Sequence, residues 1–426
     1  MTTDDPNSGT TSSARRLILL LMAMASAGYV CRVAVTVVAP GIMKEFGLSQ
    51  TQMGTVFSAF LLGYTLFQVP SGSLADRVSA RKIFLTLSSG WVLLTVLTAC
   101  VGWHGFGVAL VIPQLWIIRG IFGVLAAPTY PTSGRTLAIA IPARLQARAN
   151  SLVLASVGIG SALTPVLLAP ISVHYGWRAG LLAAAAVTTI VAVLWWMFAP
   201  HEHHAHENGV SALNSSAAES TASPRPLRTS SFWFLFASYL LQGYLGYIFI
   251  FWFYLYLVQV RHFEVLQAAS FTALPWIATM FAIPIGGVLS DAAVSRWGAT
   301  WGRRSVPLLA LCCAAIFLVI GARTPNATMA VAALTACTVL VLCTEGPFWA
   351  TMTQLSGEHS GIAGGTMNFG SNIGGMISPA LTPWLAERIG WEKALSLTAV
   401  LALIAGFLWL GVVIRTPDPR DSSPSA

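Results

Sequence analysis

Long apolar stretches separated by short polar ones run along nearly the whole chain. Each stretch has roughly 20 residues, which is enough for a helix to cross a hydrocarbon core of about 30 Å. Twelve such segments occupy residues 17–40, 53–75, 82–102, 106–127, 149–172, 178–199, 233–258, 268–290, 305–322, 328–354, 361–385 and 392–414. The pattern predicts an all-α membrane protein with 12 transmembrane helices.

Part of the sequence occurs twice, about half a chain apart. Gly158-Ile159-Gly160, Pro165 and Gly176-Trp177 return as Asn372-Ile373-Gly374, Pro379 and Gly390-Trp391, always 214 residues later. In the same way, Gly72-Ser73-Leu74-Ala75-Asp76 returns as Gly287-Val288-Leu289-Ser290-Asp291 after 215 residues. Many membrane transporters are built from duplicated halves, one of which rocks against the other.

The repeat and the polar gaps together predict five regions. They are a tail (1–16), a first six-helix bundle (17–199), a linker (200–232), a second, pseudo-symmetric six-helix bundle (233–415) and a second tail (416–426). The linker is rich in Ser, Ala and Pro, which predicts a solvated segment without fixed structure. Its tract from His201 to His206 offers imidazoles to a transition metal, although an idle solvated tract is the simpler interpretation.

Composition and charge exclude two broad classes of protein. Hydrophobic residues make up 55% of the chain and charged residues only 9%, which excludes a soluble domain. The net charge of +8 does not indicate nucleic-acid binding. If both termini are cytoplasmic, 15 of the 23 Lys and Arg residues fall on that side, which is the positive-inside pattern of a multi-pass protein. We therefore expect a cell-membrane protein with both termini in the cytoplasm.

Apart from the His201–His206 tract, the chain carries no signature of an enzyme, a cofactor site or a metal site. It contains no HExxH, no Gly-x-Ser-x-Gly on a suitable strand and no paired carboxylates within the membrane segments. The six cysteines lie in or beside apolar segments, where packing is their simplest role. We expect no cofactor and no enzymatic activity.

The duplicated loop motif resembles that of the major facilitator superfamily. Gly72-Ser73-Leu74-Ala75-Asp76-Arg77, followed by Arg81-Lys82, stands after the second predicted span, and its weaker copy ends at Asp291. The resemblance implies a fold of two six-helix bundles that works by alternating access. It also implies a cytoplasmic gate made by Asp76, Arg77, Arg81 and Asp291, whose salt bridges hold that side shut. The alternative is a positive-inside anchor with a helix stop.

Four local patterns resemble the anion:cation symporter family within that superfamily. They are Tyr29-Val30-Cys31-Arg32 with Ala39-Pro40, Phe57-Ser58-Ala59-Phe60 with Tyr64 and Pro70, Arg119 to Pro128 with Tyr130-Pro131, and Asn368 to Pro383. Members of that family carry small organic anions such as sugar acids, hexuronates and aromatic carboxylates, usually together with protons. The resemblance implies the same class of substrate here.

Two arginines inside predicted spans are the leading candidates for the substrate site. A charge at mid-membrane costs roughly 2.5 to 3.5 kcal/mol, so Arg32 and Arg119 need a counter-ion, a watery cavity or a ligand. Each planar guanidinium can grip a carboxylate with two parallel hydrogen bonds. The alternative is that they pair with acids or with backbone carbonyls. Glu345 is the one acid clearly inside a span, and it can neutralise an arginine or carry a proton.

The chain departs from its proton-coupled relatives at two positions. Many of them have an acid just before the span-one arginine and another seven residues after the span-four arginine, where this chain has Cys31 and Ala126. Proton coupling therefore runs through Glu345 or is absent. Val157 stands where relatives often have Gln or Arg, which favours a substrate with fewer hydroxyl groups than a sugar acid.

Aromatic and amide side chains complete the predicted substrate site. They are Tyr64, Tyr244, Tyr247, Trp252 and Trp349, with Asn368 and Asn372. The aromatic residues offer flat apolar faces with a polar edge, although any one of them is more often a packing residue. The two asparagines can bind substrate hydroxyls or link neighbouring helices.

The sequence as a whole predicts a monomeric carrier that takes up a small carboxylate across a bacterial inner membrane. Three alternatives remain at this stage. The protein can be an uncoupled facilitator, an exporter of an organic anion or drug, or a transporter-like receptor for a solute.

Overall fold

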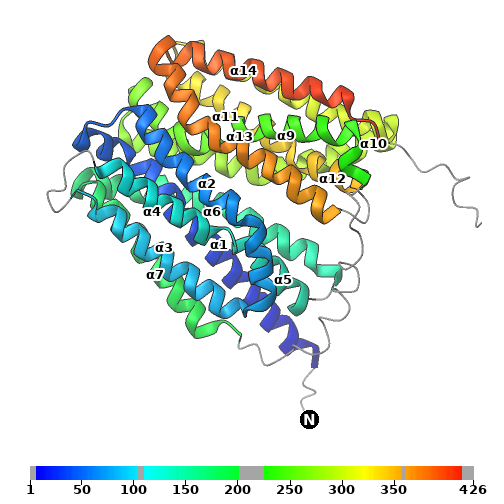
Figure 1. The fold of residues 1–426 in the computed structure, drawn as a ribbon, viewed down its shortest axis with the longest axis horizontal. Helices are drawn as coiled ribbons and strands as arrows, with labels where there is room; N and C mark the ends of the chain where they lie inside the picture. Colours follow the sequence, from blue (N-terminus) through cyan, green and yellow to red (C-terminus); the bar gives the residue numbers. More distant parts are fainter. Residues whose placement is uncertain (1–5, 103–109, 142, 201–224, 357–359, 415–426) are drawn as a thin grey trace, which may run out of the picture. The chain divides into compact units, whose positions relative to one another are not determined.

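The computed structural model describes residues 6–102, 110–141, 143–200, 225–356 and 360–414, and these are almost entirely helical, with no strand among them (Figure 1). The helices are α1 (Pro6–Phe46), α2 (Gln50–Arg77), α3 (Ala80–Cys100), α4 (Val111–Ala126), α5 (Thr129–Ala140), α6 (Ala143–Tyr175), α7 (Trp177–Phe198), η2 (Arg225–Arg228), α9 (Ser230–Leu255), η3 (Tyr256–Val260), α10 (Val265–Arg323), α11 (Ala327–Cys343), α12 (Glu345–Ser356), α13 (Ser360–Ile389), α14 (Trp391–Leu408) and η5 (Trp409–Gly411). The His201–His206 tract and the predicted tail 416–426 lie outside the described residues.

The described helices lie over all the predicted membrane segments. Nine stretches of helix in this part of the chain are long and apolar enough to cross a membrane. One of them, α10, has 59 residues and turns at Gly298, where φ is 77°, so it covers two predicted segments. α2 and α13 are not among the nine, yet they cover segments 53–75 and 361–385. The prediction of an all-α membrane protein is therefore confirmed, and the arrangement is consistent with 12 spans.

Two predicted spans are each made of two helices. The fourth span consists of α4 and α5, which are separated at Ala127 and Pro128. The tenth consists of α11 and α12, with Thr344 between them. The interruptions fall at corresponding places in the two sequence repeats.

The helices pack into two compact units. The first comprises Met1–Glu219, Ile248–Ile277 and Pro379–Glu387, and the second comprises Ser220–Tyr247, Ala278–Ser378 and Arg388–Ala426. In the first unit, α1 packs along α6 and α7, α2 along α4, and α3 along α7, and α3 and α7 run side by side in Figure 1. The predicted bundle limits at 17–199 and 233–415 stay predictions.

The sequence repeat reappears as a repeated helix contact. A Cβ atom at Gly160 in α6 would collide with the backbone carbonyl of Ser26 in α1. A Cβ atom at Gly374 in α13 would collide in the same way with the carbonyl of Leu240 in α9. The spacing from Ser26 to Leu240 is again 214 residues. Both copies of the motif thus use a glycine to bring two helix backbones into contact, as is common in membrane proteins.

We expect Gly374→Ala to destabilise the protein by about 1–3 kcal/mol, because the added methyl group forces α13 away from α9. The measurement is thermal unfolding of the purified protein in detergent. Gly365→Ala is the matched control, since Gly365 lies in the same helix with open space around it. There the substitution should be neutral or stabilising by up to about 1 kcal/mol. Equal unfolding temperatures for the two variants would contradict the close contact.

Candidate functional site

Arg32 and Arg119 lie buried at one level of the first unit. Arg32 in α1 is 5% exposed and Arg119 in α4 is 1% exposed. Nη2 of Arg119 donates to the backbone carbonyl of Arg32 at 3.2 Å, and Nη1 of Arg32 donates to the hydroxyl of Tyr29 at 3.0 Å. The first bond joins α4 to α1, and the second lies within α1.

Both guanidinium groups lie over the ring of Phe60 in α2. Its centroid lies 4.5 Å from Cζ of Arg32 and 5.5 Å from Cζ of Arg119. Arg119 also lies over Phe122, with 4.6 Å from Cζ to the ring centroid. A cation over an aromatic face is attracted to it, and the attraction grows when water is excluded. Phe60 therefore keeps two like charges close together inside the unit.

Two buried nitrogen atoms of Arg119 remain available as hydrogen-bond donors. In the described part of the chain, its Nε and Nη1 atoms have no hydrogen-bond partner, and no described carboxylate forms an ion pair with it. The alternative of pairing with backbone is realised for one nitrogen only, at the carbonyl of Arg32. A buried charged group with open donors is costly unless a ligand completes its hydrogen bonds. An anion meets that need.

Tyrosine side chains surround the pair of arginines. The ring of Tyr64 stacks on Phe60 with centroids 6.0 Å apart and lies 5.9 Å from Cζ of Arg32. The ring centroid of Tyr29 lies 4.9 Å from Cζ of Arg32, and Tyr130 stands near the start of α5. Tyr29, Phe60 and Tyr130 stand in the motifs quoted above, yet the sequence did not mark them as site residues. For Tyr29 the available signal was its position three residues before Arg32, which puts both on one helix face.

In the second unit, neutral donors surround Glu345. It is the first residue of α12, directly after the interruption at Thr344. The hydroxyl of Tyr239 donates to Oε2 at 2.8 Å, and Nε2 of Gln242 donates to Oε1 at 2.9 Å. Trp349 stands one turn further along α12. Among the described residues no Lys or Arg pairs with Glu345. Tyr239 and Gln242 were missed at the sequence level, because nothing in one sequence links them to a residue about 100 positions away.

The other predicted substrate residues divide between the two units. In the second, Tyr247 donates to Oδ1 of Asn372 at 3.1 Å, and Tyr244 is 5% exposed. Asn368 is partly exposed on α13, and Trp349 is 40% exposed. Trp252 belongs to the first unit, where its indole N–H donates to the carbonyl of Pro379 at 2.9 Å and its ring packs edge-on against Phe57. The Trp252 indole is thus occupied by packing contacts.

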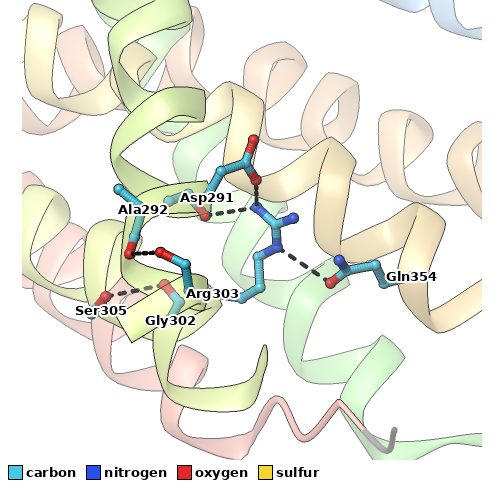
Figure 2. A network of polar contacts seen from close by, with 8 residues as sticks. Asp291, Ala292, Gly302, Arg303, Ser305 and Gln354 are labelled. Atoms are coloured by element: carbon cyan, nitrogen blue, oxygen red, sulfur yellow. Dashed lines mark hydrogen bonds and ion pairs between the residues drawn. The ribbon is translucent and has the colours of Figure 1, made fainter. Parts of the chain in front are cut away.

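The second copy of the loop motif forms a polar network around Arg303 (Figure 2). Nη1 of Arg303 pairs with Asp291 at 2.6 Å and donates to Oγ of Ser290 at 3.0 Å, while Nε donates to Gln354 of α12 at 3.2 Å. The network joins the two parts of α10 on either side of Gly298 to α12. Arg303 was noted in the sequence only as following the motif.

The first copy of the loop motif, residues 72–77, lies only partly among the residues that the structure describes. The side chain of Asp76 lies outside the described residues, and Arg77 is exposed at the end of α2. Arg81 donates to the carbonyl of Ala199 at 2.9 Å, just past the end of α7. In the second unit, Arg304 donates to the carbonyl of Val412 at 2.6 Å, just past the last helix. A cation at a helix C-terminus is stabilising, so both arginines hold helix ends. The gate role of Asp76, Arg77, Arg81 and Asp291 stays a prediction.

The first unit has a cavity of about 550 Å³ that is not lined by Arg32 or Arg119. It is lined by α1, α6 and the start of α7, including Lys44, Glu45 and Trp177, and neither buried arginine reaches it. Glu45 is already occupied there, because Arg178 and Trp177 both donate to it at 2.7 Å. The Glu45 carboxylate is therefore already paired within the cavity.

Comparison with known proteins decides the family. The chain matches the family described as Major Facilitator Superfamily over residues 18–379, with a further match over 293–426. The chain belongs to this superfamily. It is 30% identical to the "Probable sulfoacetate transporter SauU" of Cupriavidus necator, over 95% of this chain and 96% of that protein. It is 26% identical to the "Hexuronate transporter" of Bacillus subtilis, over 96% of each chain.

A solved structure of the superfamily has the same fold. The bacterial homolog of the human lysosomal transporter Spinster, in its inward-facing and occupied conformation, matches with a TM-score of 0.77 at 18% identity, covering 92% of this chain and 95% of that one. Superfamily membership confirms the predicted fold class. It also confirms that the chain is a multi-pass membrane transporter and not an enzyme.

Proposed function

We propose that this transporter carries a small organic anion, with a carboxylate or similar acidic group, across the bacterial inner membrane by alternating access. Arg119 carries the proposal, because it is buried, charged and has two donors that no described residue satisfies. Arg32 completes the anion site from α1, and Tyr64 lies beside it. Relatives named as sulfoacetate and hexuronate transporters support the same substrate class.

We assign proton coupling to Glu345 as part of this proposal. Cys31 cannot replace the missing acid before Arg32, since its thiol lies 3.0 Å from the hydroxyl of Thr188 and packs towards α7. Glu345 is the remaining acid inside a predicted span. Its partner Tyr239 has a hydroxyl that can donate to an ionised carboxylate or accept from a protonated one. The pair can therefore hold either form, as a proton carrier requires.

We also propose an orientation and an assembly state. The excess of Lys and Arg on one side supports cytoplasmic termini. Each chain contains its own anion site and its own carboxylate, so a monomer suffices for transport. Tyr247, Asn372, Asn368 and Trp349 of the second unit stay proposed substrate contacts.

Uptake of labelled organic acids into cells that express the protein tests the proposal. The panel contains sulfoacetate, a hexuronate, a short dicarboxylate and an aromatic carboxylate, each with and without a protonophore. We expect uptake of at least one acid, and we expect it to collapse with the protonophore. Uptake that equilibrates regardless of protonophore would remove the coupling to Glu345. Absence of uptake, with export or binding alone, would overturn the importer in favour of an exporter or a receptor.

A further inference from the structure

The structure points to a dianion as the preferred substrate, with two acidic groups on a short chain, one for each buried arginine. We infer this from the charges and contacts of the first unit. The inference rests on the proposed function, since it specifies which organic anions the Arg32–Arg119 site takes.

The interior of the first unit's predicted membrane segments has two positive charges and no negative charge, because Lys82 and Arg178 stand at the very first positions of their segments. Arg32 and Arg119 lie in segments 17–40 and 106–127. None of the 15 acidic residues of the chain falls within a predicted segment of this unit. Glu345 belongs to the second unit, where Tyr239 and Gln242 already donate to both of its oxygens. The membrane core of the first unit thus has a surplus of two positive charges.

The two charges are held close together. Both guanidinium groups lie over the ring of Phe60, at 4.5 and 5.5 Å from its centroid, and the charge of Arg32 acts on Arg119. Two positive charges next to one ring repel each other, and the repulsion is stronger where water is excluded. A monoanion on this site would compensate one of them. A dianion compensates both, so its binding relieves the repulsion as well as completing the open donors of Arg119.

The surroundings favour a short, weakly hydroxylated carbon skeleton. The groups next to the guanidiniums are the rings of Phe60, Phe122, Tyr64 and Tyr29. These rings offer apolar faces, with the tyrosine hydroxyls at their edges. Because both guanidiniums contact one ring, a dianion with a short skeleton can reach both, and we propose a length of about two to four carbon atoms. Dicarboxylates and sulfocarboxylates of that length belong to the class.

The test compares anions of equal skeleton that differ in charge, using the purified full-length protein. The pairs are propionate with 3-sulfopropionate, butyrate with succinate, and glucuronate with glucarate. Affinity is read from intrinsic tryptophan fluorescence and from thermal stabilisation in detergent. We expect at least tenfold tighter binding of the dianion within the short pairs, and weaker binding of glucarate than of succinate.

Arg32 variants show whether the second charge makes the difference. In Arg32→Gln we expect the ratio between dianion and monoanion to fall below threefold, while Arg32→Lys keeps most of the preference and confirms that the site still folds. Arg323→Gln is the matched control, because Arg323 is exposed and pairs with the exposed Glu392. It should leave the ratio unchanged.

The outcomes separate this inference from the proposed function. If monoanions bind as tightly as their dianion partners, the dianion inference is overturned and the organic-anion carrier stands. A preference that persists in Arg32→Gln also overturns it, since the second charge would then play no part. If no anion of the panel binds, both ideas fall.

Discussion

Arg119→Gln should reduce uptake of the substrate more than 100-fold. The substitution removes a buried charge and the donors at Nε and Nη1 that we assign to the anion. Losing charge-assisted hydrogen bonds of this kind costs about 3 kcal/mol or more, and each 1.4 kcal/mol is a factor of ten in affinity. The measurement is initial uptake of the best acid of the panel, normalised to the amount of protein in the membrane.

Two variants make the Arg119 result specific. Arg323→Gln makes the same chemical change at an exposed position and should transport normally. Arg119→Lys keeps the charge but loses the planar fork, so we expect partial activity. Size-exclusion profiles must show that Arg119→Gln is folded. Near-normal uptake by a folded Arg119→Gln protein would remove the anion site from the proposal.

Glu345→Gln should abolish the dependence of uptake on the proton gradient. A glutamine keeps the shape of the side chain and one oxygen for Tyr239 or Gln242, but it cannot gain or lose a proton. Net accumulation should fall about tenfold or more, because each tenfold gradient of substrate needs about 1.4 kcal/mol of driving energy. The measurements are uptake against external pH, with and without a protonophore.

Exchange of labelled for unlabelled substrate distinguishes lost coupling from lost binding. In Glu345→Gln this exchange should continue, since it needs no net proton movement. Glu392→Gln provides the control, because Glu392 is 60% exposed in its ion pair with Arg323. If Glu345→Gln keeps the pH dependence of the unaltered protein, another group carries the proton.

Much of the fold could be predicted from hydropathy and the repeat. The twelve apolar segments correspond to helices because a chain in lipid must satisfy its backbone hydrogen bonds internally. The glycines at 160 and 374 stood out in the sequence by their common offset, and the structure gives the reason, which is a backbone contact in each copy. Hydropathy could not show the interruptions at Pro128 and Thr344, because apolar residues continue on both sides of each.

The candidate site was predictable only as far as charge allowed. Arg32, Arg119 and Glu345 stood out because charged residues are rare in apolar segments. Their partners did not, since Phe60 and Tyr239 are ordinary residues for a membrane helix and come from distant parts of the chain. Trp252 shows the reverse case, because its ring looked suited to a ligand but packs on Phe57 and the Pro379 carbonyl. Which aromatic residues contact a charge is decided by helix packing, which a single sequence does not specify.

Each of the two interrupted spans has a proline at or near its interruption. Pro128 and Pro347 have no backbone N–H, so bending at these points breaks fewer hydrogen bonds than elsewhere in a helix. Beyond the first interruption, α5 is tied to α2, because Arg135 donates to the carbonyl of Ala75. Beyond the second, α12 is tied to α10 through Gln354 and Arg303. Each short helix is thus bonded to a neighbouring helix, and Glu345, which we propose as the proton carrier, is the first residue after the second interruption.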